Sequence, residues 1–117
     1  MKTKSDCYAL LQEVVTARDR LCRAPGCCGL SSAAHHIFGR GNLTTAFNPR
    51  YAIGMCLKCH VPWAHAKPVQ FKEWVISWMG TDEFYSALRL SNMVIKHHDY
   101  DKIYKDLRQY QIYNNRS

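Results

Sequence analysis

The chain has 117 residues, of which 47% are hydrophobic, which suffices for one modest core but not for two. Lysine and arginine number 16 against 9 aspartates and glutamates, so the formal net charge is +7 with histidine neutral. This composition excludes an intrinsically disordered chain, and the sequence has neither an apolar run of membrane-spanning length nor a signal-peptide segment, so we expect a cytoplasmic protein with no membrane partner.

Secondary structure is predicted from the spacing of apolar residues and from turn residues. Apolar side chains recur at helical spacing over residues 5–21, with Ser5 or Asp6 as the candidate N-cap. Pro68 should end or kink the helix before it, and Thr81 with the two acidic residues after it indicates another N-cap. The expected helices cover residues 5–21, 60–66, 69–79, 81–97 and 101–113, and two antiparallel strands at residues 30–37 and 51–55 enclose a loop at residues 38–50.

These elements predict an α+β protein formed by a single domain, residues 1–117. Its expected segments are an N-terminal helix over residues 1–21, a metal-bound core over residues 22–67 and a C-terminal helical extension over residues 68–117. The aromatic C-terminal helices could also form a homodimer.

Two closely spaced cysteine pairs indicate a structural zinc site. Cys22 and Cys27 flank a Pro-Gly turn, and Cys56 and Cys59 are separated by two residues. In a reducing compartment such pairs favour tetrahedral Zn²⁺ over disulfides. Cys28 could replace Cys27 as the ligand, and the alternative to zinc is four unrelated buried thiols.

Three histidines lie beside the cysteine pairs in the sequence. His35 and His36 end the first predicted strand, where neighbouring side chains face opposite sides, and His60 follows Cys59 directly. Together with the segments CRAPGC, CLKCH and AHAKPVQFKEW, this arrangement resembles the HNH endonucleases, also called ββα-metal or His-Me finger nucleases, in the form that embeds the motif in a four-cysteine zinc site. The resemblance covers about residues 22–74 and is to the phage and recombination-associated type, which implies a bacterial or phage-infected cell.

The resemblance implies a zinc-stapled ββα-metal core that hydrolyses DNA phosphodiester bonds. His35 and His60 would bind a catalytic divalent ion (Mg²⁺, Mn²⁺, Ni²⁺ or Zn²⁺), and His36 would be the general base that takes a proton from water. Neutral imidazole suits the second role, because its pKa lies near neutrality. The alternatives for these histidines are a second zinc site and core imidazoles bonded to the backbone.

Two further positions bear on the predicted catalytic site. His65 is a candidate metal ligand or phosphate contact, but it lies five residues after His60, whereas a regular helix brings residues four apart onto one face. Tyr51 occupies the position of the middle asparagine of the HNH pattern, and Asn48 is the residue that could stand in for it.

Basic residues near the motif suggest DNA as the partner, because cations neutralise phosphates. Arg40, four residues after His36, is the candidate phosphate clamp, since a guanidinium can bind phosphate bidentately. The competing interpretations are a catalytically inactive zinc module that binds nucleic acid and a protein-binding adaptor. The predicted DNA contacts are Arg23, Arg40, Arg50, Lys58 and Lys67.

Overall fold

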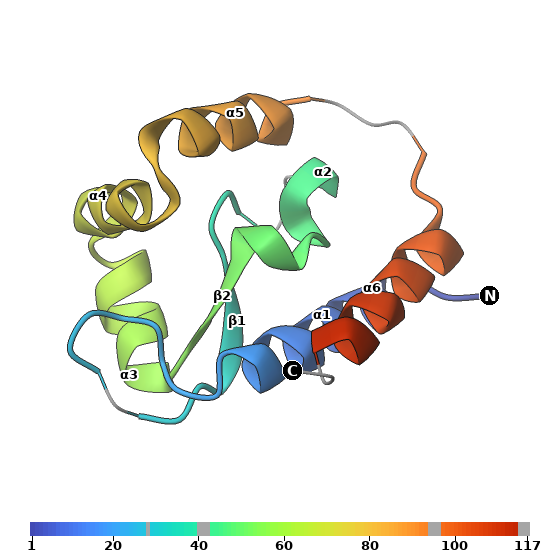
Figure 1. Ribbon diagram of the computed structural model, residues 1–117, viewed down its shortest axis with the longest axis horizontal. Helices are drawn as coiled ribbons and strands as arrows, with labels where there is room; N and C mark the ends of the chain where they lie inside the picture. Colours follow the sequence, from blue (N-terminus) through green and yellow to red (C-terminus); the bar gives the residue numbers. More distant parts are fainter. Residues whose placement is uncertain (28, 40–42, 94–96, 115–117) are drawn as a thin grey trace.

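The structure, a computed structural model, describes residues 1–27, 29–39, 43–93 and 97–114, without the side chains of residues 61 and 62. A two-stranded antiparallel sheet lies at the centre, with a pair of helices on one side and a series of shorter helices on the other (Figure 1). The strands are β1 (Ala33–His36) and β2 (Ala52–Met55), which confirms the antiparallel pairing and the α+β class. The helical elements are α1 (Lys4–Arg18), α2 (Leu43–Ala46), the 3₁₀ turn η1 (Pro49–Tyr51), α3 (Leu57–Cys59), the π-helical turn η2 (His60–His65), α4 (Pro68–Met79), α5 (Thr81–Ser91) and α6 (Tyr100–Asn114).

Helix α1 begins one residue before the predicted start and ends three residues before the predicted end. Its N-cap is Thr3, whose hydroxyl accepts a hydrogen bond from the Asp6 N–H, while the Asp6 carboxylate accepts one from the Thr3 N–H. Ser5 and Asp6 were therefore the wrong caps, because Asp6 completes a capping box from inside the helix. The apolar face of α1 packs on both strands and on α6, with Leu11 and Val15 fully buried.

The pleat of the sheet divides the core into two parts. Ala34 and Ala52 pack with α1 and α6, whereas Ile53 packs among the cysteine loops, α4 and α5. Because successive side chains of a strand point to opposite faces, His35 and His36 at the end of β1 enter different surroundings.

A buried carboxylate fastens the end of α1 to the sheet. Asp19 is 4% exposed, and its carboxylate accepts hydrogen bonds from the guanidinium groups of Arg18 and Arg23. It also accepts one from the Gly54 N–H of β2 at 3.0 Å, and Arg18 donates further to the Ala52 carbonyl at 2.7 Å. Burial alone would raise the pKa of Asp19, but its hydrogen bonds and the two guanidinium charges outweigh burial and lower this pKa. The network joins α1, the first cysteine loop and β2.

Replacing Asp19 with alanine should destabilise the fold by about 3–5 kcal/mol, because Arg18 then stays partly buried without its carboxylate. Asp106→Ala, which removes the exposed partner of Lys102, should cost less than about 1 kcal/mol and is the control. Urea unfolding of both variants measures the difference, and equal free energies of unfolding would contradict it. Since the native pKa of Asp19 is depressed, its stabilisation should be complete above the pKa of an ordinary aspartate and lost as the pH falls through the native value.

The first strand is shorter than predicted, and the segment after it, which was predicted as a loop, contains helical turns. Leu30 does not extend β1 but pairs with Leu21 in an isolated bridge that closes the first cysteine loop. The segment predicted as a loop at residues 38–50 contains α2 and most of η1. Asn48 caps η1, with Pro49 in its first turn, and these two residues therefore begin a turn rather than extend a loop.

The boundaries of the later helices differ from the prediction for local reasons. Pro68 ends the preceding turn as predicted, and it also begins α4, because its fixed φ suits the first turn of a helix. Gly80 is the N-cap of α5, so Thr81 is the first helical residue and not the cap. Helix α5 ends at Ser91, six residues before the predicted end.

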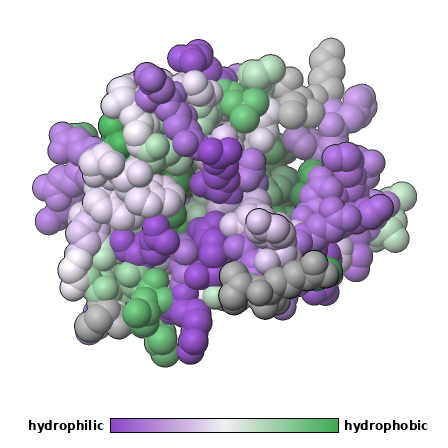
Figure 2. Space-filling model, in the orientation of Figure 1, coloured by the Kyte–Doolittle hydropathy of each residue, from purple (hydrophilic) through white to green (hydrophobic). Residues whose placement is uncertain are grey.

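The face shown in Figure 2 is covered mainly by hydrophilic residues, and its apolar patches are separate from one another. Helix α6 packs on α1 within the chain, and the homodimer through the C-terminal helices stays a prediction (Figure 1). None of the described helices combines the length and the apolar character needed to cross a membrane.

Candidate functional site

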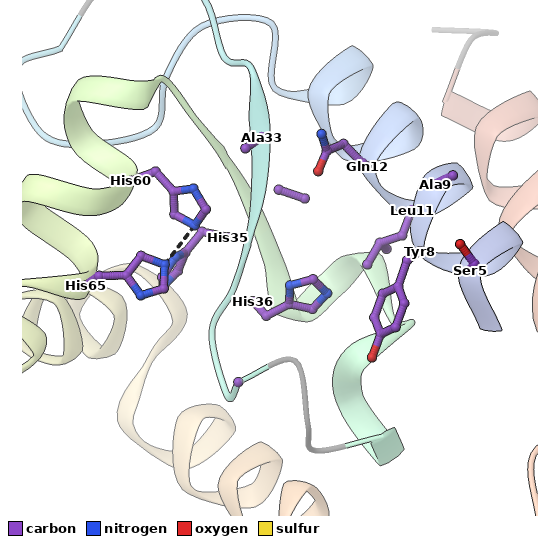
Figure 3. A pocket seen from close by; sticks show the side chains of 12 residues that line it. Ser5, Tyr8, Ala9, Leu11, Gln12, Ala33, His35, His36, His60 and His65 are labelled. Atoms are coloured by element: carbon purple, nitrogen blue, oxygen red, sulfur yellow. Dashed lines mark hydrogen bonds between the residues drawn. The ribbon is translucent and has the colours of Figure 1, made fainter.

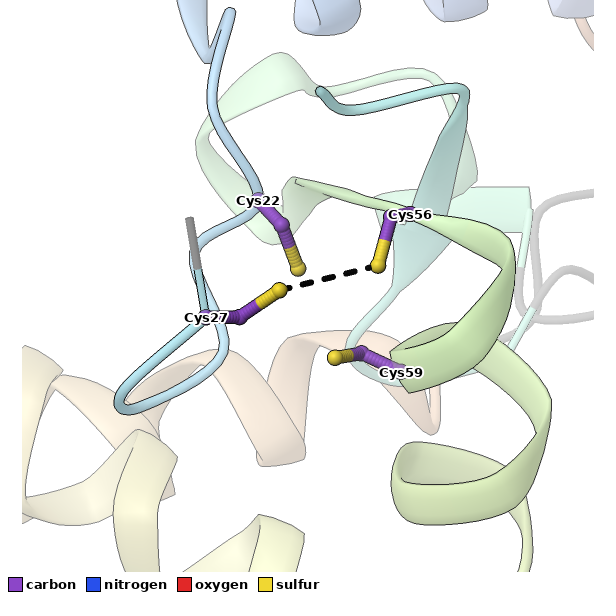
Figure 4. Close-up of side chains that lie close together, drawn as sticks. All are labelled: Cys22, Cys27, Cys56 and Cys59. Carbon is purple, nitrogen blue, oxygen red and sulfur yellow. Dashed lines mark hydrogen bonds between the residues drawn. The ribbon is translucent and has the colours of Figure 1, made fainter. Parts of the chain in front are cut away.

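The four predicted zinc ligands lie together where the loop after α1 meets the start of α3 (Figure 4). The sulfurs of Cys22, Cys27, Cys56 and Cys59 all lie within 4.8 Å of one another, and those of Cys27 and Cys56 are 3.7 Å apart. Tetrahedral Zn²⁺ with Zn–S bonds of about 2.3 Å separates two sulfurs by about 3.8 Å. The cluster could therefore hold a zinc ion, and the described cysteines form no disulfide. Cys28, the alternative ligand, lies outside the described residues.

Local hydrogen bonds explain how the first cysteine pair is formed. The Cys22 N–H donates to the Gly29 carbonyl at 2.8 Å, which brings the two ends of the loop together. The Cys27 N–H donates to the Ala24 carbonyl at 3.1 Å, and Gly26 adopts a φ of +75° between them. A side chain is strained at this φ, so the glycine permits the turn that directs Cys27 back toward Cys22.

The second pair begins a helix. The Cys56 carbonyl accepts hydrogen bonds from the N–H groups of Cys59 and His60, and this turn places the two sulfurs on one side. Burial opposes ionisation of Cys56, but hydrogen bonds from the Cys59 N–H and the neighbouring thiols lower the pKa of Cys56 to about 7. Burial and the thiols of the other three cysteines raise the pKa of Cys59. A cation among the sulfurs favours the thiolate form of every ligand, as zinc binding requires.

The histidines form a second cluster, which we call the histidine triad (Figure 3). Ring nitrogens of His35, His60 and His65 lie within 4.8 Å of one another, and the Nε2 atoms of His60 and His65 are 3.0 Å apart. Two nitrogens bound to one ion at about 2.1 Å lie about 3.0 Å apart at a right angle and about 3.4 Å apart in a tetrahedron. The Nδ1 atom of His35 is buried and makes no hydrogen bond within the described residues. Three imidazoles gathered in this way fit a divalent transition metal.

The π-helical turn η2 explains how His60 and His65 meet. In an α-helix with 3.6 residues per turn, side chains five residues apart are separated by about 140° around the axis. A π-helix forms hydrogen bonds between residues five apart, so these residues lie one turn apart on the same side. Pro62, which has no N–H to donate to an α-helical ladder, lies within this turn. The α-helical spacing, which argued against His65 as a ligand beside His60, does not apply to this π-helical turn.

Burial keeps His35 neutral. Its side chain is 6% exposed, and the ring of Phe71 from α4 packs against it at a centroid separation of 4.6 Å and nearly at a right angle. Burial, followed by the charges of the neighbouring imidazoles, lowers the pKa of His35 to about 3. Burial and His65 also lower the pKa of His60. Metal ions bind neutral imidazole, so both residues can act as ligands at neutral pH.

His36 lies on the other side of β1 from the histidine triad and points toward α1 (Figure 3). Its ring meets that of Tyr8 edge-on at a centroid separation of 5.9 Å, and Tyr8 packs on Phe47 at 4.7 Å. One pocket of about 670 Å³, which we call the histidine pocket, is lined by His36 and by the whole triad. A substrate in it can contact both at once. The opposite wall comes from α1 and consists of Ser5, Tyr8, Ala9, Leu11 and Gln12.

The described chain thus has two groups of side chains that could hold a metal, one of sulfurs and one of imidazoles. No family model, curated protein or solved structure matches this chain. The chemistry of each group therefore follows from its own donor atoms. Four thiolates suit structural zinc, whereas three imidazoles leave coordination positions for water or a substrate.

Two of the residues predicted to contact DNA, Arg23 and Arg50, form ion pairs with carboxylates of the same chain. Arg23 forms an ion pair with Asp19 at 3.3 Å, and its guanidinium lies 5.2 Å from the centre of the Trp78 ring. Arg50 forms an ion pair with Glu83. Both arginines are less available to phosphate than predicted, because carboxylates partly neutralise them.

Of the other three residues predicted to contact DNA, two lie within the part of the chain that the structure describes. Lys58 on α3 and Lys67 just before α4 are exposed, as a phosphate contact requires. Arg40, the predicted phosphate clamp, lies outside the described residues.

Asn48 and Tyr51 are not among the residues that line the histidine pocket. The side-chain oxygen Oδ1 of Asn48 accepts a hydrogen bond from the Arg50 N–H at 3.0 Å and caps η1. The Asn48 side chain thus helps to form the turn before β2, and its role as a stand-in for the HNH asparagine stays a prediction. Tyr51 packs edge-on against Phe38 in the core.

The sequence did not predict the wall that α1 contributes to the pocket. Spacings of three and four residues place Ser5, Tyr8, Ala9 and Gln12 on one face of the helix, and that much is visible in the sequence. Nothing in the sequence indicates that this face lies opposite the histidines. Their juxtaposition depends on the packing of α1 against the sheet.

Proposed function

We propose that the protein is a metal-dependent HNH-type DNA endonuclease that hydrolyses or nicks phosphodiester bonds. The observation that supports this most is the convergence of the histidine triad and His36 on one pocket. The net charge of +7 favours a polyanionic partner. The element order also supports a zinc-stapled ββα-metal core, since β1 supplies His35 and His36, and β2 leads through α3 into η2 with His60 and His65.

In the proposed reaction, His36 accepts the proton of the attacking water. The three imidazoles of the triad would hold the ion. A divalent ion bound there supplies Lewis-acid stabilisation of the scissile phosphate and of the departing 3′ oxygen. Because His36 and the triad line one pocket from different sides of β1, a phosphate in that pocket would meet the base on one side and the leaving-group stabiliser on the other, as in-line displacement requires. The resemblance implies 5′-phosphate and 3′-hydroxyl products.

A catalytically inactive zinc-containing module that binds nucleic acid or a protein is the second candidate. It is favoured by Tyr51, which replaces the asparagine of the HNH pattern and packs against Phe38 rather than lining the histidine pocket.

Plasmid nicking tests the proposal. The zinc-loaded protein should nick supercoiled DNA in at least one of Mg²⁺, Mn²⁺, Ni²⁺ and Zn²⁺. His65→Ala should raise the ion concentration needed for half-maximal cleavage at least about tenfold, because it removes one of three ligands. His97→Ala, an exposed histidine outside the site, is the matched control and should change nothing. Absence of cleavage with every ion, combined with salt-sensitive DNA binding, would favour the second candidate.

A further inference from the structure

The histidine pocket has two chemically different walls. One wall carries four histidines, and the other is the stripe of α1 formed by Ser5, Tyr8, Ala9 and Gln12 (Figure 3). Tyr8 is half-buried and packs against His36 of β1 and against Phe47, while Ser5, Ala9 and Gln12 are open to solvent.

The residues of α1 that line the pocket carry no charge, and the Lys4 ammonium lies 5.9 Å from the centre of the Tyr8 ring. None of the described residues that line the histidine pocket is a lysine, arginine, aspartate or glutamate. A neighbouring pocket that shares His35, His36 and His65 is lined by Lys72, so a fixed positive charge that could bind a phosphate lies near the histidines. Phosphates are bound by cations, whereas bases and sugars are bound by aromatic rings, small apolar side chains and neutral hydrogen-bonding groups. The α1 wall has the second set of groups.

The size of the pocket points to a single nucleotide. Its volume of about 670 Å³ lies within the range of about 300–1,000 Å³ that is usual for sites of small ligands. A base that is stacked and paired inside a duplex cannot enter such a pocket, so the nucleotide that occupies it has to be unpaired.

We propose that the α1 stripe binds the base and sugar of an unpaired nucleotide adjacent to the scissile phosphate. This rests on the endonuclease function proposed above and adds to it a substrate feature and a second contact surface. Ala9 lies at the middle of the stripe, where its small side chain leaves room for the base. Tyr8 offers a ring edge and Gln12 offers an amide, both of which a nucleoside can use.

A leucine scan on α1 tests the proposal. Ala9→Leu fills the pocket without loss of helix propensity, and Ala17→Leu makes the same change at an exposed position of α1 outside the pocket. Each is combined with His36→Ala so that the zinc-loaded protein does not cut, and binding to a single-stranded oligonucleotide is measured by fluorescence anisotropy. Ala9→Leu should weaken binding about tenfold, and Ala17→Leu should not weaken it. Gln12→Ala is a second variant that adds no bulk and should weaken binding in the same sense.

Oligonucleotides with one abasic position distinguish a base contact from general obstruction of the strand. Moving the abasic position along the strand should identify one position at which Ala9→Leu and its parent bind equally well. Equal affinities of the Ala9→Leu and Ala17→Leu proteins, or a loss that is the same at every abasic position, would overturn the proposal. In either case nicking by the wild-type protein would leave the endonuclease function standing. If the wild type cuts nothing, that function fails, and the abasic series still decides whether α1 binds a base.

Discussion

Replacing His36 with alanine is expected to lower the rate of the proposed DNA cleavage about 10²- to 10⁴-fold, because the proposed reaction loses its general base. The change should leave the histidine triad intact, since His36 points to the other side of β1. Binding of the divalent ion and of DNA should therefore be close to that of the wild type. Single-turnover cleavage of a labelled oligonucleotide, with ion affinity measured separately, provides both quantities.

The expected contrast is with His35→Ala, which should lose cleavage together with ion affinity because His35 is a triad ligand. His97→Ala should lose neither. If His36→Ala cut DNA at the wild-type rate, His36 would not be the base, although the triad could still hold an ion. If it also lost the ion, the separation of base and ligands by β1 would be incorrect.

Replacing Cys59 with alanine should abolish binding of the proposed structural zinc and unfold the central part of the chain. Binding of zinc to four-ligand structural sites contributes about 10–16 kcal/mol at pH 7. This is comparable with the whole stability of a typical domain, about 5–15 kcal/mol. Ile53 and Met55 pack beside the cysteine loops, so loss of the metal should disturb the strand that leads to His60. Metal content per chain and the thermal transition followed by circular dichroism measure both effects.

Cys7→Ala is the matched control, because Cys7 is fully buried but lies in a separate apolar cluster with Phe47. It should keep one zinc per chain in the sulfur cluster and lower the stability by no more than about 3 kcal/mol. A Cys59→Ala protein that retained zinc and melted near the wild-type temperature would show that the four sulfurs are not a metal site.

The cysteine cluster illustrates what local sequence can predict. A turn that Pro25 and Gly26 favour brings the sulfurs of Cys22 and Cys27 close together. The first turn of a helix does the same for the sulfurs of Cys56 and Cys59. Each pair forms within a few residues, so its spacing carries enough information. Only the choice between Cys27 and Cys28 depends on more than spacing.

The histidine site was predicted in part. The opposite directions of His35 and His36 follow from the period of a strand and needed no tertiary information. The position of His65 did not follow, because the prediction assumed an α-helix and η2 is π-helical. The surroundings that keep His35 neutral depend on Phe71 of α4, a residue distant in the sequence.

Residue types and short spacings alone specified the α+β class, the antiparallel strand pair, the four-sulfur cluster and the candidate ligands His35 and His60. Tertiary packing decided that α1 faces the histidines and that the Glu83 carboxylate holds Arg50. The physical reason is how far apart in the sequence the interacting residues lie. Turns, pleats and helical periods are set by neighbouring residues, whereas a pocket wall or an ion pair joins segments that meet only after the core has formed.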